Sequence, residues 1–413
     1  MFDWELSSHL NSWMFTPELL RECRLRSNQE AKNAMESSKK KSDTGEESKS
    51  KLPYPVQHFS SGYQVRRAKN GIVESQPSNK KDDENFDDGE SSQDESMKFL
   101  QPEEEQQLIQ FYSGMLPSII GPTAHSRRLQ KDQKVPATAN LFFRRFFLSN
   151  SITMYDPKSI LLASAFLASK VEEGMVHVQS LEDATRNMGL GVVLVKDILE
   201  SELHLVTGLN FELMCSHPYK ALIALWEDLR TFLKSDKGKQ FATIDTGTEE
   251  IIPITSGDLK PIYDEARRII DDVCISDVPL LFSAGQIALG AMMTANEELL
   301  VNKKQKYVPK INFRGYIHHR FEGGKQYNEN KISTLTKSLE TLMPILKDLK
   351  TPGGKYGCGN YPVDTDILKG IHKKLKKCRV WGSSGDKDGD GKKKKKKRKK
   401  NGQGENNKNK KKN

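Results

Sequence analysis

Two charged residues, Lys170 and Glu202, each belong to a helical segment with an apolar stripe. Lys170 ends a helical segment with an uncharged interior, where a cation meets the negative end of the helix dipole. Glu202 lies among apolar residues at helical spacing, a costly position for a carboxylate unless it is paired. The simplest structural interpretation is a Lys170–Glu202 bridge that orients two helices. Such a pair alone contributes only about 0–1 kcal/mol at a surface, which leaves room for a binding role.

Other patterns that imitate reactive sites do not hold up. Residues 386–391 begin like a calcium loop, but position twelve is Lys397 instead of Glu and nine basic residues start at Lys392, which excludes calcium. The glycine-rich stretch 353–357 matches neither phosphate-binding pattern and favours a flexible linker. His318-His319 has no ligand cluster at metal spacing, which favours surface histidines. We expect no metal and no cofactor.

Catalysis by the chain itself is not expected either. The sequence contains no glycine-rich kinase loop, no H-R-D and no D-F-G, so it is not itself a kinase. We assign no catalytic residue.

Helices must position Lys170 and Glu202, because apolar residues recur at helical spacing from Gln101 onward. Each half of the chain offers about five helices. The third of each set, near 158–171 and 280–293, has an uncharged interior and is rich in small residues, so protein must surround it. A repeated plan of this kind predicts two tandem all-helical units.

The ends of the chain differ from this helical body. Residues 10–35 predict a short helix with Thr16 as N-cap, preceded by Trp13 and Phe15, which can anchor it to a larger body. Residues 36–98 are polar and without periodicity, which predicts a disordered insertion.

Charge and cysteine content narrow the class of protein. The 413 residues carry a net charge of +10, all of it within 386–413, so the rest of the chain is neutral. Attraction to nucleic acid therefore belongs to the tail, and no specific nucleic-acid binding is expected. Five scattered cysteines predict a reducing compartment. Without a signal peptide or an apolar span, we expect an intracellular protein that is not in a membrane.

Several stretches resemble the cyclins, and among them the cyclin H group. The first cyclin box is matched by 143–148 and 167–173, and the N-terminal helix by 13–16. The passage between boxes is matched by 209–219, and the second box by 276–289, the most specific of these stretches. The resemblance covers residues 10–35 and 99–349.

The resemblance implies an all-α fold of two tandem five-helix cyclin boxes with flanking N- and C-terminal helices, plus a disordered insertion and tail. The expected domains are an N-terminal helix packing on the boxes (10–35), the insertion (36–98), the first box (99–214), the second box (215–349), and a linker with a disordered Lys-rich tail (350–413). The first box is expected to bind the kinase.

It also implies a function. A protein of this group is a regulatory subunit that binds and activates a cyclin-dependent kinase of the activating type, together with a RING-finger assembly factor. The kinase then phosphorylates the activation loops of other cyclin-dependent kinases and, within TFIIH, the C-terminal domain of RNA polymerase II. The implied location is the nucleus, and the run from Lys392 to Lys400 favours an import signal over a nucleic-acid tether or plain disorder.

The resemblance implies a binding site too. In cyclins, a Lys and a Glu at the positions of Lys170 and Glu202 hold the regulatory helix of the kinase. The same surface would include the following neighbours: Val171, Glu173, Val206, Phe211 and Leu213. For each apolar one, burial in the box core is the competing interpretation.

Two alternatives that keep the cyclin fold stay open, and a third does not depend on it. One is another transcriptional cyclin of the C, K or T type, against which the Trp13/Phe15 segment and the second-box stretch argue. The other is a TFIIB-like nucleic-acid-binding factor with cyclin folds, which would need paired cysteines in an N-terminal zinc ribbon. A non-kinase helical scaffold is a further reading, because fold does not determine function.

Overall fold

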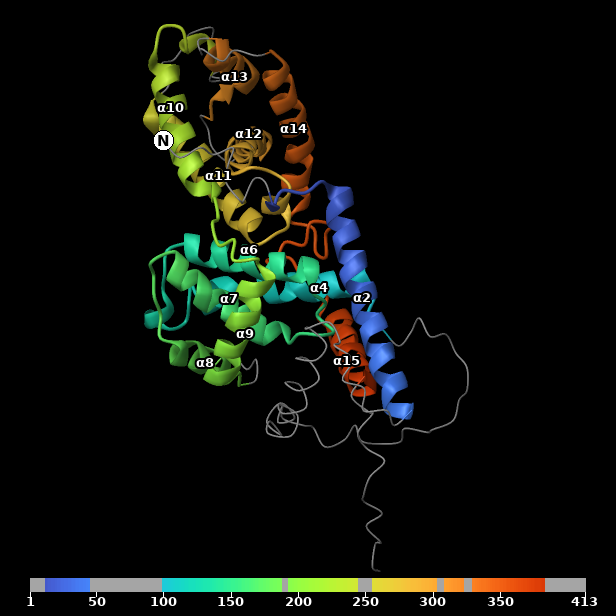
Figure 1. Cartoon of the computed structure of the whole chain (residues 1–413). Helices are drawn as coiled ribbons and strands as arrows, with labels where there is room; N and C mark the ends of the chain where they lie inside the picture. The colour runs from blue at the N-terminus through green and yellow to red at the C-terminus, as the bar shows by residue number, and fades with distance from the viewer. Residues whose placement is uncertain are drawn as a thin grey trace, which may run out of the picture.

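Two helical units stack on each other in the structure, a computed structural model (Figure 1). Their helices and loops are described for residues 12–44, 99–187, 192–243, 255–302, 308–322 and 329–382. Helix α2 (Pro17–Thr44) runs along one side, past the junction of the units and beside α15 (Thr365–Gly382) (Figure 1). The Thr16 hydroxyl accepts from the Leu19 amide at 3.2 Å, the N-cap that the sequence predicts.

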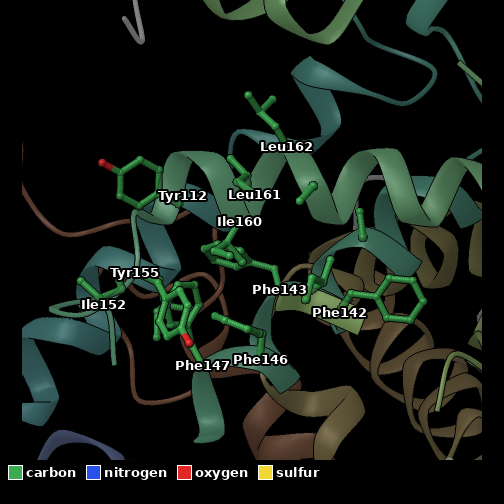
Figure 2. Close-up of a cluster of buried hydrophobic side chains, with 14 of the residues drawn as sticks. Tyr112, Phe142, Phe143, Phe146, Phe147, Ile152, Tyr155, Ile160, Leu161 and Leu162 are labelled. Carbon is green, nitrogen blue, oxygen red and sulfur yellow. The ribbon is translucent and has the colours of Figure 1, made fainter. Parts of the chain in front are cut away.

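The first unit is built around α6 and α7. Its helices are α4 (Pro102–Ser113), α5 (Leu116–Ile119), α6 (Lys134–Ser149), α7 (Pro157–Val171), α8 (Val178–Asn187) and α9 (Val195–Gly208), with a 3-10 turn at Arg127–Leu129. Four phenylalanines of α6 are buried, and Phe146 meets both Phe147 and Tyr155 edge-on, with ring centroids 5.2 and 4.9 Å apart (Figure 2). Asp156 caps α7 by accepting from the Ser159 amide at 3.2 Å.

The second unit surrounds α12. Its helices are α10 (Pro218–Lys234), α11 (Ser256–Cys274), α12 (Ala284–Asn302), α13 (Phe313–Glu322) and α14 (Glu329–Asp348), with 3-10 turns at Lys239–Phe241 and Val278–Leu280. Strands β1 (Ala242–Thr243) and β2 (Lys310–Ile311) form one short antiparallel pair. Helix α12 packs against α10, α11 and α14. Gly290 allows this closeness, because a Cβ there would lie 2.7 Å from the Leu342 side chain.

The all-α class agrees with the prediction, and the apolar stretches 158–171 and 280–293 fall largely in α7 and α12. Helix α12 continues beyond the predicted stretch to Asn302 and ends with the charged Glu297 and Glu298. At the N-terminus, α2 continues to Thr44, into the range predicted as insertion. The remainder of that insertion, 45–98, and the Lys-rich tail with its calcium-like sequence, 383–413, lie outside the described residues.

The linker predicted after residue 350 is wrong where α15 forms, although a flanking C-terminal helix was part of the predicted fold. Its buried side chains, Leu368, Ile371, Leu375 and Cys378, share the core of the first unit. Lysines interleave with these residues in sequence and conceal their apolar stripe. The buried Arg379 fixes the helix further, donating to the carbonyls of Ile152 and Tyr155 at 2.7 Å each.

The glycine-rich stretch 353–357 is not the flexible linker that the sequence predicts. The Asp277 amide donates to the Tyr356 carbonyl at 2.9 Å, and Arg144 Nη2 donates to the Gly357 carbonyl at 2.5 Å. Gly357 has φ of +59°, a left-handed conformation that suits glycine. The stretch is therefore part of the junction between the two units.

Candidate functional site

Lys170 and Glu202 form an ion pair between α7 and α9. Lys170 Nζ lies 2.7 and 2.9 Å from the two carboxylate oxygens of Glu202. The Lys170 ammonium also lies 4.0 Å from the ring centroid of Phe166, one turn earlier on α7. The Lys170 side chain is 37% exposed and that of Glu202 is 16% exposed, so solvent, and hence another protein, can reach the pair.

Helix α9 presents apolar side chains on both sides of Glu202. Leu199 is 45% exposed and Leu203 is 64% exposed, one turn before and one residue after Glu202. After the end of α7, Met175 is 71% exposed. The sequence prediction missed all three as surface residues. For Leu199 and Leu203 the reason is that apolar residues on a helix usually face a core. The weak signal was that the apolar positions of α9 cover more than one face.

The loop that follows α9 turns Phe211 outward. Asn210 and Phe211 have φ of +52° and +60°, and the Phe211 side chain is 70% exposed. Single exposed aromatics are normal on proteins, but this one directly follows the helix that carries the exposed Leu199 and Leu203. We call Lys170, Met175, Leu199, Glu202, Leu203 and Phe211 together the α7–α9 surface.

The other predicted site residues divide into two groups. Val171, Val206 and Leu213 are half-buried and pack against the core of the first unit. For them the structure supports a packing role with an exposed edge. Glu173 is exposed and has φ of +56° at the turn that ends α7.

Glu172 ties the end of α7 to neighbouring elements. It accepts from the Thr138 hydroxyl of α6 at 2.6 Å, and Lys134 Nζ and His217 Nε2 lie 3.4 and 3.7 Å from its carboxylate. Burial alone would raise the pKa of Glu172, but hydrogen bonds from His217, Thr138 and Lys134 lower it to about 2. These contacts hold the turn that carries Lys170 and Glu173.

Neither a metal site nor a membrane span is found in the part of the chain that the structure describes. No three His, Cys, Asp or Glu side chains there gather as metal ligands. The helices there lack the length and apolarity that a bilayer crossing requires. The five cysteines are free. His318 is exposed, as the sequence predicts, whereas His319 is half-buried and packs against the rings of Phe232 and Phe241.

Two protein-family models match the sequence of this chain. The family described as "Cyclin, N-terminal domain" matches residues 123–214, and "Cyclin C-terminal domain" matches 217–351. Among similar proteins, Cyclin-H1-1 of Arabidopsis thaliana is 26% identical over 94% of this chain and 92% of its own length. Cyclin CCL1 of Saccharomyces cerevisiae is 29% identical, over 51% of this chain and 46% of that protein.

A solved structure shares the fold. A chain of the CAK complex from Chaetomium thermophilum bound to ATP-gamma-S superimposes with a TM-score of 0.55 at 20% identity, over 91% of this chain and 88% of that one. The two stacked units are thus the two cyclin boxes, and the resemblance to cyclin H extends over nearly the whole length of the Arabidopsis relative. With both cyclin domains matched over more than half of its residues, this chain belongs to the cyclin family.

Proposed function

We propose that this chain is the regulatory subunit of a cyclin-dependent kinase of the CDK-activating type, and that the α7–α9 surface holds the regulatory helix of that kinase. The observation that carries the proposal is the Lys170–Glu202 pair, preformed at 2.7 Å and flanked by exposed apolar side chains. A charged pair at the centre can orient backbone groups of a partner helix. The apolar rim supplies contact area and excludes water.

Activation follows as a shift of population. The cyclin binds only the kinase state in which the regulatory helix is turned inward, the state that completes the Lys–Glu pair of the kinase. A ligand shifts such an equilibrium only through its preference for one state. The preformed pair favours this mechanism, because no rearrangement of α7 and α9 is needed before the kinase helix docks.

The proposed partners and substrates are inferred from the similar proteins. The similarity to Cyclin-H1-1 over almost the full chain favours the cyclin H role, and the fold matches a chain of a CAK complex. We propose that the complex contains a RING-finger assembly factor and acts on CDK activation loops. Within TFIIH, it would phosphorylate the C-terminal domain of RNA polymerase II. The Lys-rich tail would direct the protein to the nucleus, which deletion of 386–413 and imaging would test.

The decisive experiment removes both charges of the pair. We expect Lys170→Ala with Glu202→Ala to abolish co-purification of the kinase while the helical CD signal stays unchanged. The matched control is Asp366→Ala with Lys369→Ala, an exposed ion pair of 2.9 Å on α15, which should leave binding intact. Kinase retained by the first variant would refute this docking surface. Mass spectrometry of proteins co-purified from nuclear extract would identify the kinase.

A further inference from the structure

The N-terminal segment of residues 12–15 is hydrogen-bonded to the loop that carries Phe211. Ser12 Oγ donates to Glu212 Oε1 at 3.0 Å, across 200 residues of sequence. Three residues further on, the Phe15 amide donates to the Leu280 carbonyl of the second box at 2.8 Å. The segment is therefore attached at one end to the loop after α9 and at the other to the second box.

Between these two attachments, Trp13 covers Arg145. Trp13 is buried, and its ring centroid lies 4.9 Å from the guanidinium carbon of Arg145, a cation–π contact. Arg145 is fully buried on α6. Burial lowers the pKa of Arg145, and Cys215 and Glu212 counteract this electrostatically. A buried cation needs compensation. The Trp13 ring supplies it by direct contact, and the negative charge of Glu212 acts in the same direction.

The loop of residues 209–214 has an unusual backbone conformation. Asn210 and Phe211 are consecutive left-handed residues, which non-glycine residues seldom adopt and which persist where the surroundings hold them. The Phe211 amide donates to the Val206 carbonyl at 3.1 Å, and the Glu212 amide to the Leu209 carbonyl at 2.9 Å. This backbone path leaves Phe211 exposed to solvent, whereas the Glu212 carboxylate accepts a hydrogen bond from the Ser12 hydroxyl of the N-terminal segment.

We propose that the N-terminal segment, anchored by Trp13 on Arg145 and by Ser12 on Glu212, holds Phe211 in its docking conformation. This inference rests on the proposed function, because it assumes that Phe211 contacts the kinase. It adds that the N-terminal segment sets the conformation of the kinase-facing loop without touching the kinase. Loss of the segment would release the carboxylate, relax the left-handed pair and withdraw the aromatic anchor.

The test uses the full-length chain with Trp13→Ala. We expect amide hydrogen exchange in 209–214 to accelerate and kinase affinity to fall about tenfold, the usual effect of losing one interfacial anchor. Trp13→Phe should keep exchange in 209–214 and kinase affinity close to those of the unmodified chain, because it keeps an aromatic face for Arg145. The matched control is Trp226→Ala in the second box, whose ring lies 5.0 Å from the Arg230 guanidinium, and it should change neither quantity.

A double-variant comparison separates positioning from general destabilisation. In a Phe211→Ala background, Trp13→Ala should cause no further loss of affinity, because the anchor is already absent. An equal tenfold loss in both backgrounds, or unchanged exchange in 209–214, would overturn the proposal. Should Trp13→Ala fail to fold, the double variant Ser12→Ala with Glu212→Gln replaces it. We expect the same faster exchange in 209–214 and the same loss of kinase affinity. Hydrogen exchange is measured without the kinase. If only the docking surface is wrong, exchange in 209–214 still accelerates while kinase affinity stays unchanged; if the loop coupling is wrong, exchange does not accelerate.

Discussion

Arg144 of the first cyclin box and Asp277 of the second, 133 residues apart, form an ion pair with Nη1 and Oδ1 2.6 Å apart. Both side chains are 1% exposed. Arg24 of α2 reaches the other oxygen of the same carboxylate at 2.7 Å. Gln106 of α4 donates to that oxygen at 2.9 Å. One carboxylate therefore joins the N-terminal helix and both boxes.

Asp277→Ala should destabilise the protein strongly. The change leaves two buried or half-buried guanidinium groups without their anion, and breaking one side of a buried pair costs about 3–5 kcal/mol. Urea denaturation measures this loss in the free energy of unfolding. The control Asp366→Ala, at an exposed carboxylate, should change it by less than about 0.5 kcal/mol. Similar losses in the two variants would contradict the role of the junction.

Stability should fall at acid pH through Glu172. The pKa of this carboxyl is about 2, below its ordinary 4.5, so its contribution is present above 4.5 and lost as pH falls toward 2. The difference in unfolding free energy between the unmodified chain and Glu172→Gln should shrink across this window. Denaturation curves at several pH values measure it. A difference that stays constant over the window would show that Glu172 is not held by these contacts.

Exchanging the charges of the central pair distinguishes binding from an internal bridge. Lys170→Glu with Glu202→Lys preserves an ion pair, so the free energy of unfolding should change by less than about 1 kcal/mol. Kinase binding should weaken by about 2–5 kcal/mol, because partner groups then meet the wrong charges. Calorimetric titration with the purified kinase measures the affinity. Undiminished binding by this variant would assign the pair a purely structural role.

Leu203, the more exposed of the two exposed leucines of α9, should contribute to binding and not to folding. Leu203→Asp places a charge in the apolar rim and should weaken kinase binding by at least about 1 kcal/mol, with little change in stability because Leu203 is 64% exposed. Ile223→Asp is the control, at a 47% exposed apolar residue on α10 of the second box. Pull-down with graded kinase concentrations compares them. Equal weakening by both changes would rule out a specific role for α9.

Helix α15 should stabilise the first box through Arg379. Arg379→Ala leaves the carbonyls of Ile152 and Tyr155 without this donor, and an unsatisfied buried polar group costs about 1–3 kcal/mol. Thermal unfolding measures the loss. Lys376→Ala, an exposed lysine on the same helix, should have almost no effect. If both variants melt like the unmodified chain, α15 does not support the fold.

Local patterns in the sequence determined most of the helices. The Asp156 cap, the uncharged run of α7 and the phenylalanines of α6 are readable because capping and helical periodicity involve residues within a few positions of each other. The Lys170–Glu202 pair was predicted from the resemblance to the cyclins, supported by the cost of an unpaired carboxylate in an apolar stripe.

Only the tertiary structure decided which apolar residues stay exposed and which distant groups meet. Leu203 and Val206 look alike in sequence, yet the first is exposed and the second packs on the core. The pairing of Arg144 with Asp277 depends on how two separately folded boxes stack, which no local spacing encodes. Helical periodicity is a property of a few neighbouring residues, whereas burial depends on which surfaces of the whole chain are brought together.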